Sequence, residues 1–209
     1  MTRVCVYIDG FNLYHAIHNL KDNRLKWLDL KALIGFFLDP NVHRLQEVYY
    51  FSAFATWKPD AHTRHIAYEK ALKISGVKTV MGKFKNKDRS CNTCGTTWIG
   101  HEEKETDVNI ALYLLDGAYQ DKYDEAIIIS QDSDLFPAIK LVKQRFPLKS
   151  IKIITPPNMW HSKEMAQVVG QKKLGKIQQI HIERSLFPQE IKDSGGKVLV
   201  YRPAKYGKK

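Results

Sequence analysis

The sequence AIIISQDSD occupies residues 126–134 and decides the expected fold. Its first four residues are apolar and mostly β-branched, a pattern typical of a strand buried on both faces of a parallel sheet. Asp132 and Asp134 follow at the carboxyl end of that strand, where open α/β sheets bind their ligands. A second apolar run, at residues 4–8, ends in the same way with DGFN at residues 9–12. The two strands together predict one shared acidic pocket.

Strand-like and helical patterns alternate along the rest of the chain. We expect strands at about residues 3–9, 46–53, 77–82, 125–131, 150–155 and 177–182. We expect helices at residues 11–20, 28–38, 61–75, 106–119 and 134–146. This alternation predicts an α/β fold in which a mostly parallel central sheet lies between two layers of helices.

Two stretches interrupt the alternation. Residues 83–104 are polar and basic and are expected to form an insertion before the helix at 106–119. Residues 186–209 are expected to form a basic C-terminal extension with a short strand at 198–200. The main domain is therefore predicted to span residues 1–185.

The composition favours a polyanionic partner. The 209-residue chain has 33 Lys and Arg against 22 Asp and Glu, a net charge of +11, which favours nucleic acid over a solely solvated basic surface. The sequence shows no basic amphipathic helix of the kind that binds a membrane surface. No apolar stretch approaches the roughly 18 residues that are needed to span a bilayer. The start of the chain lacks a signal-peptide pattern, and three cysteines do not suggest a disulfide framework, so we expect a cytoplasmic protein without a membrane partner.

Four aspartates form the candidate site: Asp9, Asp107, Asp132 and Asp134. Each has a simpler explanation alone, because Asp107 suits the first turn of a helix, Asp132 or Asp134 suits a helix N-cap, and Asp9 suits a turn. Together, converging carboxylates repel one another unless a cation lies among them.

Hard oxygen ligands select Mg²⁺ or Mn²⁺, which also bridge phosphate oxygens, lower the pKa of bound water and stabilise in-line displacement at phosphorus. A basic surface around such an acidic cleft is the charge arrangement of a nuclease. Asn12 lies three residues after Asp9 and either orients a phosphate or water or caps the first helix.

Three motifs resemble those of NYN domains, a branch of the PIN-like ribonuclease superfamily. Residues 4–12 (VCVYIDGFN) resemble the opening Asp-Gly-x-Asn motif, and residues 103–108 (EKETDV) resemble the second, with Lys followed three residues later by Asp. Residues 130–137 (SQDSDLFP) resemble the third, and SLFP at 185–188 is similar to bacterial members of uncharacterised type. Glu105 departs from the small residue usual after the motif lysine, and it adds either a fifth carboxylate or a solvated charge.

The resemblance implies a PIN-like α/β/α fold and RNA cleavage that depends on Mg²⁺ or Mn²⁺. The residues that it places in the catalytic site are Asp9, Asn12, Asp107, Asp132 and Asp134, with the four aspartates as metal ligands. It also implies that Lys104 contacts phosphate, a role that suits its position just before a helix that begins with a carboxylate; the alternative is one more surface lysine.

The insertion contains half of a zinc-binding pattern. Cys91 and Cys94 have the spacing of two ligands to one tetrahedral ion, and His101 is a nearby third candidate. Three roles for the two cysteines remain open: zinc ligands, a redox-active thiol pair, or two inert thiols. If they bind zinc, a homodimer would supply a second cysteine pair.

The same insertion mixes basic and aromatic residues, among them Lys83, Lys85 and Trp98. Bases of single-stranded RNA stack on aromatic rings while lysines contact phosphates, so we expect this insertion to bind substrate.

These observations favour a metal-dependent ribonuclease. The alternative is a non-catalytic RNA-binding regulator with the same fold. An aspartyl-nucleophile phosphatase would also place Asp9 at the end of the first strand, but Phe11 stands where that chemistry needs its general acid.

Overall fold

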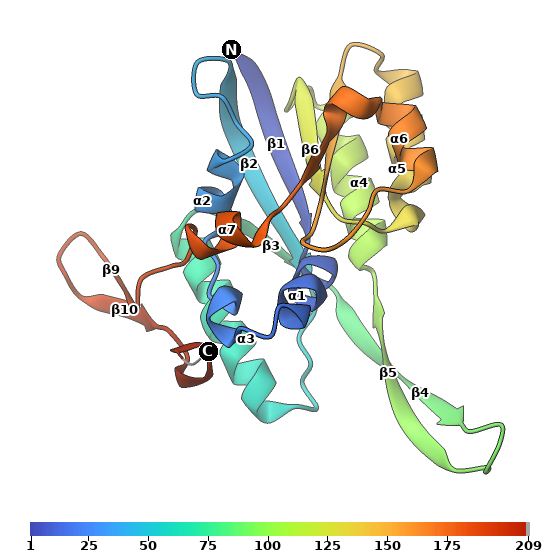
Figure 1. Cartoon of the computed structure of the whole chain (residues 1–209), viewed down its shortest axis with the longest axis vertical. Helices are drawn as coiled ribbons and strands as arrows, with labels where there is room; N and C mark the ends of the chain where they lie inside the picture. Colours follow the sequence, from blue (N-terminus) through green and yellow to red (C-terminus); the bar gives the residue numbers. More distant parts are fainter. Residues whose placement is uncertain (208–209) are drawn as a thin grey trace.

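Six parallel strands form the central sheet of this protein, which we describe from a computed structural model that covers residues 1–207 (Figure 1). Their order across the sheet is β3-β2-β1-β6-β7-β8. The strands are β1 (Thr2–Asp9), β2 (His43–Ser52), β3 (Lys78–Met81), β6 (Glu125–Ile129), β7 (Ser150–Thr155) and β8 (Leu174–Lys176). All five neighbouring pairs are parallel, as expected for strands that are joined through helices.

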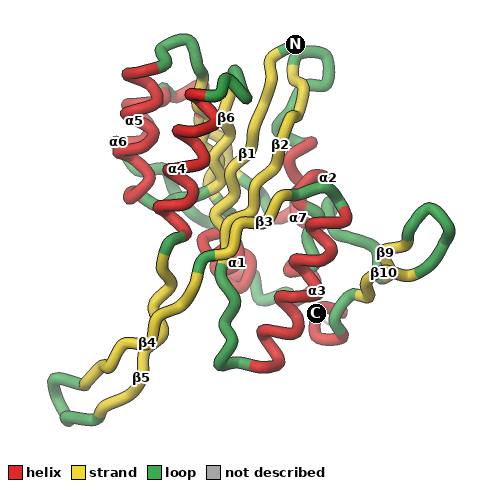
Figure 2. Tube along the Cα trace, turned by 180° about the vertical axis from the view of Figure 1, so that it is seen from behind, coloured by secondary structure: helices red, strands yellow, loops and turns green. Residues whose placement is uncertain are grey.

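Helices cover both faces of the sheet. They are α1 (Gly10–Asn19), α2 (Leu30–Gly35), α3 (Pro59–Ile74), α4 (Thr106–Tyr119), α5 (Phe136–Arg145), α6 (Lys163–Val169) and α7 (Gln179–Glu183). Short 3₁₀ turns are η1 (Asn23–Lys26), η2 (Ser133–Leu135), η3 (Gln171–Lys173) and η4 (Ala204–Gly207). Figure 2 shows α4, α5 and α6 on one side of the sheet and α2, α3 and α7 on the other. The expected three-layer α/β/α fold is confirmed.

Alternate residues of each buried strand supply the two hydrophobic cores, because successive strand side chains point to opposite faces. In β1, Val4, Val6 and Ile8 join the core under α1, α2 and α3. Cys5 and Tyr7 join the core under α4, α5 and α6. Burial on both faces explains why β1 and β6 are almost continuously apolar.

The order of the strands reverses between β1 and β6. The chain runs outward from β1 to β2 and β3, and then returns to the centre and runs outward again from β6 to β7 and β8. Such a topological switch point leaves a crevice at the carboxyl ends of the two central strands, where open α/β sheets bind ligands. Ile8 lies opposite Ile129 in the ladder, so Asp9 and Ser130 leave the sheet side by side.

One expected strand is wrong. Residues 177–182 do not form the edge strand, which lies three residues earlier as β8, and residues 179–183 form helix α7. Ile180 and Ile182 alternate as in a strand, but only Ile182 is buried and Ile180 is exposed. Helix α6 was not among the expected elements, and Ser162 begins it by accepting a hydrogen bond from the Met165 N–H (3.1 Å).

Residues 83–104 form an antiparallel hairpin of β4 (Lys83–Ser90) and β5 (Thr97–Lys104) that projects from the body of the molecule (Figures 1 and 2). Aromatic contacts hold its base. Phe84 packs edge-on against Trp57 (ring centroids 4.6 Å apart) and Phe11 (5.4 Å), and His101 stacks on Trp57 (3.7 Å).

Residues after Ser185 return to the body of the molecule. They include the small antiparallel pair β9 (Glu190–Lys192) and β10 (Val198–Tyr201). The Trp27 indole N–H donates to the Pro188 carbonyl (2.8 Å), and Phe187 packs against the Trp27 ring. Ile191 belongs to the core that also contains Trp27.

We therefore expect Ile191→Val to lower the free energy of unfolding by about 1 kcal/mol, the usual cost of one buried methylene. The melting temperature should fall by roughly 2–4 °C in a chain of this size. Ile66→Val makes the same change at an exposed site and serves as the control. Equal melting temperatures for the two variants would contradict the packing of this segment.

No helix within residues 1–207 combines the length and apolar character needed to cross a membrane.

Candidate active site

Three aspartates meet at the switch point. Asp9 ends β1, Asp132 follows β6 by three residues, and Asp107 lies in the first turn of α4. One carboxylate oxygen from each lies within 4.8 Å of the other two. They line a pocket of about 200 Å³ together with Phe11, Asn12, His15, Glu103, Thr106 and Met159.

A chain of hydrogen bonds fixes Asp9 and Asp132. The buried Ser130 hydroxyl donates to Asp9 Oδ2 (2.9 Å) and accepts from the Asp132 N–H (2.9 Å). Asp9 Oδ1 also caps α1 by accepting from the Asn12 N–H (2.9 Å). The local sequence therefore aims both carboxylates into the same space.

Asn12 joins the two strand ends. Its side-chain Oδ1 accepts from the Gln131 N–H (3.0 Å), so it does not cap α1, a role that Asp9 takes. Among the described residues, no protein group accepts from its amide NH₂, which leaves that donor available to a ligand.

Gly10 allows this junction to close. A Cβ at this position would lie 2.6 Å from the Phe51 carbonyl oxygen and 2.6 Å from the Tyr50 ring. Because the backbone atom cannot move away cheaply, only glycine fits between Asp9 and Phe11.

The carboxylates resist ionisation in the absence of a cation. Burial raises the pKa of Asp9 to about 6, with further contributions from the charges of Asp132 and Glu103, although hydrogen bonds from Asn12 and Ser130 oppose this rise. Burial also raises the pKa of Asp107 to about 6, and the negative charges of Asp132, Asp9 and Glu103 make smaller contributions in the same direction. Grouped carboxylates with raised pKa values and only oxygen donors fit Mg²⁺ or Mn²⁺.

The family model described as the NYN domain matches residues 3–168. The chain belongs to the NYN domain family. The NYN family lies in the PIN-like nuclease group.

Two individual proteins are similar to this NYN protein. One is 6-hydroxy-3-succinoylpyridine 3-monooxygenase HspA of Pseudomonas putida (strain DSM 28022 / S16), which is 24% identical over 188 residues. The alignment covers 74% of this chain and 59% of HspA, so the chain spans less than two thirds of that relative. The other is a crystal structure of a protein of unknown function, VPA0982, from Vibrio parahaemolyticus RIMD 2210633. It aligns with a TM-score of 0.55 at 16% identity and covers 89% of this chain and 96% of that one, which supports the fold.

Asp134 lies outside the group of three in this NYN domain. It is exposed, and its N–H donates to Asp132 Oδ1 (2.9 Å). Its charge still contributes to the raised pKa of Asp107, so it lies near the pocket without sharing the candidate metal position.

Glu103 is the acidic residue that sequence reasoning missed. It lines the pocket, and its Oε1 accepts hydrogen bonds from the N–H and the hydroxyl of Thr106, which fixes the start of α4. Glu105, which we considered as a fifth carboxylate, instead pairs with Lys83 and takes a left-handed conformation (φ 82°). The register of the β4–β5 hairpin decides which glutamate faces the site, and the motif alone does not give that register.

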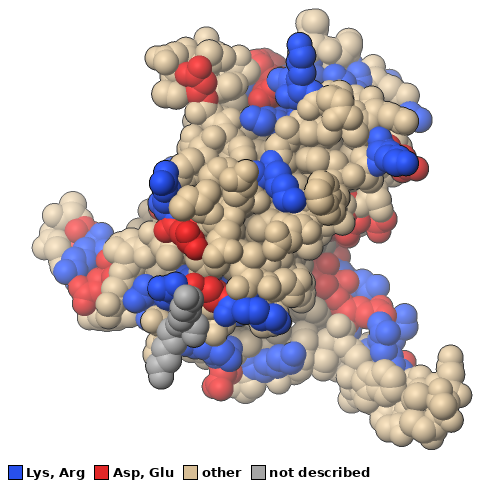
Figure 3. Space-filling model, viewed as in Figure 1, with Lys and Arg blue, Asp and Glu red and all other residues tan. Residues whose placement is uncertain are grey.

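The predicted substrate contacts lie on the hairpin. Lys104 pairs with Glu102 (3.2 Å), and Lys83 pairs with Glu105. Lys85 and Trp98 are exposed on the two strands. Figure 3 shows acidic side chains gathered where the hairpin leaves the body, with basic side chains beside them.

The structure does not bring His101 to the cysteines. Cys91 and Cys94 lie in the turn at the tip, whereas His101 pairs with Asn86, five residues before Cys91 and so roughly 17 Å along the strand. Backbone N–H groups of Cys94 and Thr93 lower the pKa of the Cys91 thiol to about 7. A zinc ion held by Cys91 and Cys94 therefore needs two ligands from elsewhere, such as the cysteine pair of a second copy.

Proposed function

We propose that this protein is a ribonuclease that uses Mg²⁺ or Mn²⁺ to hydrolyse phosphodiester bonds of RNA. The observation that carries the proposal is the convergence of Asp9, Asp107 and Asp132 at the switch point, with oxygens within 4.8 Å of one another. Family membership supports nuclease chemistry, and the net charge of +11 supports a polyanionic substrate.

Each residue has a distinct proposed role. Asp9, Asp107 and Asp132 would hold the ion, which supplies charge neutralisation at the phosphate and an acidified water. Ser130 keeps Asp9 and the Asp132 loop in place through its two hydrogen bonds. The Asn12 amide is free to donate to a phosphate oxygen, and Asp134 adds negative charge beside Asp107 without contacting the ion.

The hairpin and its cations guide the strand to this pocket. Lys85 and Trp98 are exposed and project with the hairpin, where a phosphate and an unpaired base can reach them. Lys83 and Lys104 would exchange their glutamate partners for phosphate, at little cost because exposed ion pairs are weak.

The test is cleavage of single-stranded RNA by the purified full chain. We expect products with Mg²⁺ or Mn²⁺ and none with EDTA, because the carboxylates alone only repel phosphate. An Asp132→Asn protein purified in the same way excludes a contaminating nuclease. Tight RNA binding without cleavage under either metal would instead establish the non-catalytic regulator.

A second candidate activity comes from HspA, whose name describes a monooxygenase that acts on 6-hydroxy-3-succinoylpyridine. The observation that favours it is a cavity of about 530 Å³ with aromatic walls beside the acidic pocket. Oxygen uptake with this pyridine and a reduced nicotinamide, in the absence of RNA cleavage, would support it over the nuclease.

A further inference from the structure

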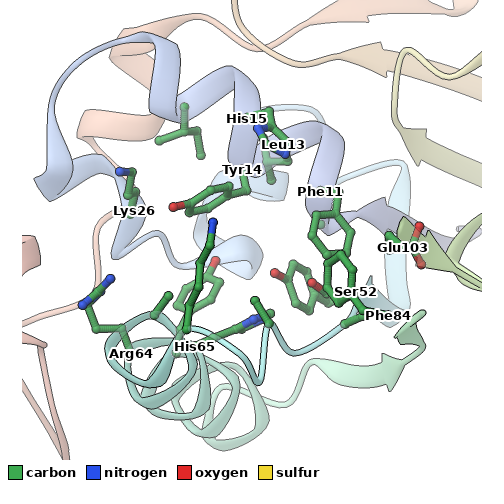
Figure 4. Close-up of a pocket in the computed structure, with 18 of the residues that line it drawn as sticks. Phe11, Leu13, Tyr14, His15, Lys26, Ser52, Arg64, His65, Phe84 and Glu103 are labelled. Atoms are coloured by element: carbon green, nitrogen blue, oxygen red, sulfur yellow. The ribbon is translucent and has the colours of Figure 1, made fainter. Parts of the chain in front are cut away.

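The larger cavity adjoins the acidic site but is not part of it. It has a volume of about 530 Å³, within the range of ligand-binding pockets, and its walls come from α1, α3, the loop at 53–58 and the base of the hairpin (Figure 4). Phe11, His15 and Glu103 line both spaces. A ligand in the cavity can therefore continue into the acidic pocket.

Flat aromatic walls form the part of the cavity nearest the hairpin. Trp57 lies almost parallel to His101 (12°), with ring centroids 3.7 Å apart. Phe84 stands edge-on to both Trp57 (4.6 Å) and Phe11 (5.4 Å). Figure 4 shows Phe11 and Phe84 side by side at the end of the cavity near Glu103. Such walls favour a planar ring.

Cations lie at the other end. Lys26 and Arg64 line the cavity, and Figure 4 places both away from Glu103. Within residues 1–207, neither forms an ion pair with a carboxylate. Burial lowers the pKa of Lys26, and the charges of Lys205 and Arg64 add to this effect, so a phosphate bound here would relieve the repulsion among these cations. Figure 3 shows basic side chains grouped over this part of the surface, near α1, α3 and the C-terminus.

Two imidazoles of the walls have unused hydrogen-bonding capacity. His65 Nε2 and His101 Nδ1 are buried and have no partner in the described part of the chain. Burial lowers the pKa of His65 to about 4, so its ring is neutral near pH 7 and has one donor and one acceptor nitrogen. Rearrangement of these rings around a ligand would satisfy both nitrogens, whereas a purely apolar ligand would not.

We propose that this cavity binds one nucleotide of the RNA strand, with its base against Trp57 and Phe84 and one flanking phosphate near Lys26 and Arg64. The inference rests on the proposed function, because the other flanking phosphate would lie in the acidic pocket. A nucleotide in a strand has a phosphate on each side of its base, which matches a cavity that has cations at one end and adjoins the proposed metal site at the other. A base can enter only when it is unstacked, so the preferred substrate class is single-stranded RNA.

The test measures binding to the full chain in EDTA, where no cleavage occurs. The probes are uridine monophosphate, adenosine monophosphate, a labelled single-stranded RNA decamer and the same decamer with abasic nucleotides.

Two variants of the cavity are compared with the wild-type protein. Phe84→Leu removes the flat ring but keeps apolar volume, and Arg64→Gln removes one cation. The matched controls are Phe36→Leu, at an exposed ring, and Arg145→Gln, at an exposed end of α5. Circular dichroism verifies that all four variants fold.

We expect both mononucleotides to bind without metal and the abasic decamer to bind at least tenfold more weakly than the intact one. Phe84→Leu and Arg64→Gln should each weaken mononucleotide binding by roughly tenfold, and the controls should match the wild-type protein. Undetectable mononucleotide binding, unchanged affinity in both cavity variants, or binding of a succinoylpyridine in place of nucleotides would overturn the inference.

Parallel cleavage assays with Mg²⁺ separate this inference from the proposed function. If the wild-type protein cleaves RNA and both cavity variants bind and cleave equally well, only the nucleotide cavity is wrong. If mononucleotides bind as expected but no metal supports cleavage, the cavity is supported and the nuclease is contradicted.

Discussion

Asp132→Asn should lower the rate of metal-dependent RNA cleavage by at least 100-fold. The substitution removes one of the three charges that converge at the candidate metal position, and metal-assisted stabilisation of the transition state contributes several kcal/mol, with each 1.36 kcal/mol equal to a tenfold change in rate. The fold should survive, because an asparagine oxygen can still accept the hydrogen bond from the Asp134 N–H.

Asp134→Asn is the matched comparison, since it makes the same change two residues away but outside the group of three. We expect its rate to stay within tenfold of the wild-type rate at saturating Mg²⁺. The measurement is the single-turnover cleavage rate of one RNA by both variants. A larger loss for Asp134→Asn than for Asp132→Asn would contradict the assignment of the metal ligands.

Asp9→Asn should abolish cleavage and yet stabilise the metal-free protein at pH 7.5. The pKa of Asp9 rises from 3.8 to about 6 on folding, so its charged form destabilises the folded state. At 1.36 kcal/mol per pH unit, removal of this charge is expected to add about 3 kcal/mol, or roughly 6–12 °C in melting temperature. Asparagine retains the oxygen that caps α1, and its NH₂ can donate to the Ser130 oxygen in place of the lost acceptor.

The pH dependence tests the sign of this effect. Between pH 3.8 and about 6, the folded protein binds more protons at Asp9 than the unfolded chain does. The contribution of Asp9 to the stability of the metal-free wild-type protein therefore falls as the pH rises through this window, and Asp107 acts in the same direction. His65, whose pKa burial lowers to about 4, acts in the opposite direction, so the difference between the wild-type protein and Asp9→Asn is the quantity that isolates Asp9. The advantage of Asp9→Asn should be small near pH 4, where Asp9 is protonated in the folded protein, and vanish at lower pH, where it is protonated in both states.

Thermal melts at pH 4 and pH 7.5, with EDTA or Mg²⁺, measure all of these quantities. Mg²⁺ at pH 7.5 should raise the melting temperature of the wild-type protein and have a much smaller effect on Asp9→Asn, because ligand binding to the folded state stabilises it. A metal-free Asp9→Asn protein that melts below the wild-type protein at pH 7.5 would contradict the proposed repulsion.

The cluster of Asp9, Asp107 and Asp132 could be predicted from the sequence because the topology of a parallel sheet constrains where strands and helices begin and end. Asp9 and Asp132 each follow an apolar run, and the carboxyl ends of neighbouring parallel strands must meet at one edge. Asp107 joins them because α4 begins at that edge. Asp134 is the exception, since the 3₁₀ turn that Asp132 caps leaves it exposed and outside the group.

Features that depend on tertiary contacts were not predictable in this way. Glu103 faces the pocket because of the hairpin register, and β8 is too short a strand to leave a clear periodic signal. The larger cavity combines Phe11, Trp57 and Phe84, which are far apart in the sequence and meet only where the hairpin packs against the body. The packing of residues 186–207 could not be predicted either, because their basic composition gives no indication that Ile191 joins the core.

The central claim is that Asp9, Asp107 and Asp132 hold the divalent ion that cleavage requires. The most direct measurement is anomalous diffraction from crystals of the full chain soaked in Mn²⁺ at a pH above 7. We predict a manganese peak between these three carboxylates in the wild-type protein and its loss in Asp132→Asn. Crystals saturated with Mn²⁺ that show no peak there, while the same protein preparation cleaves RNA with Mn²⁺, would contradict the claim.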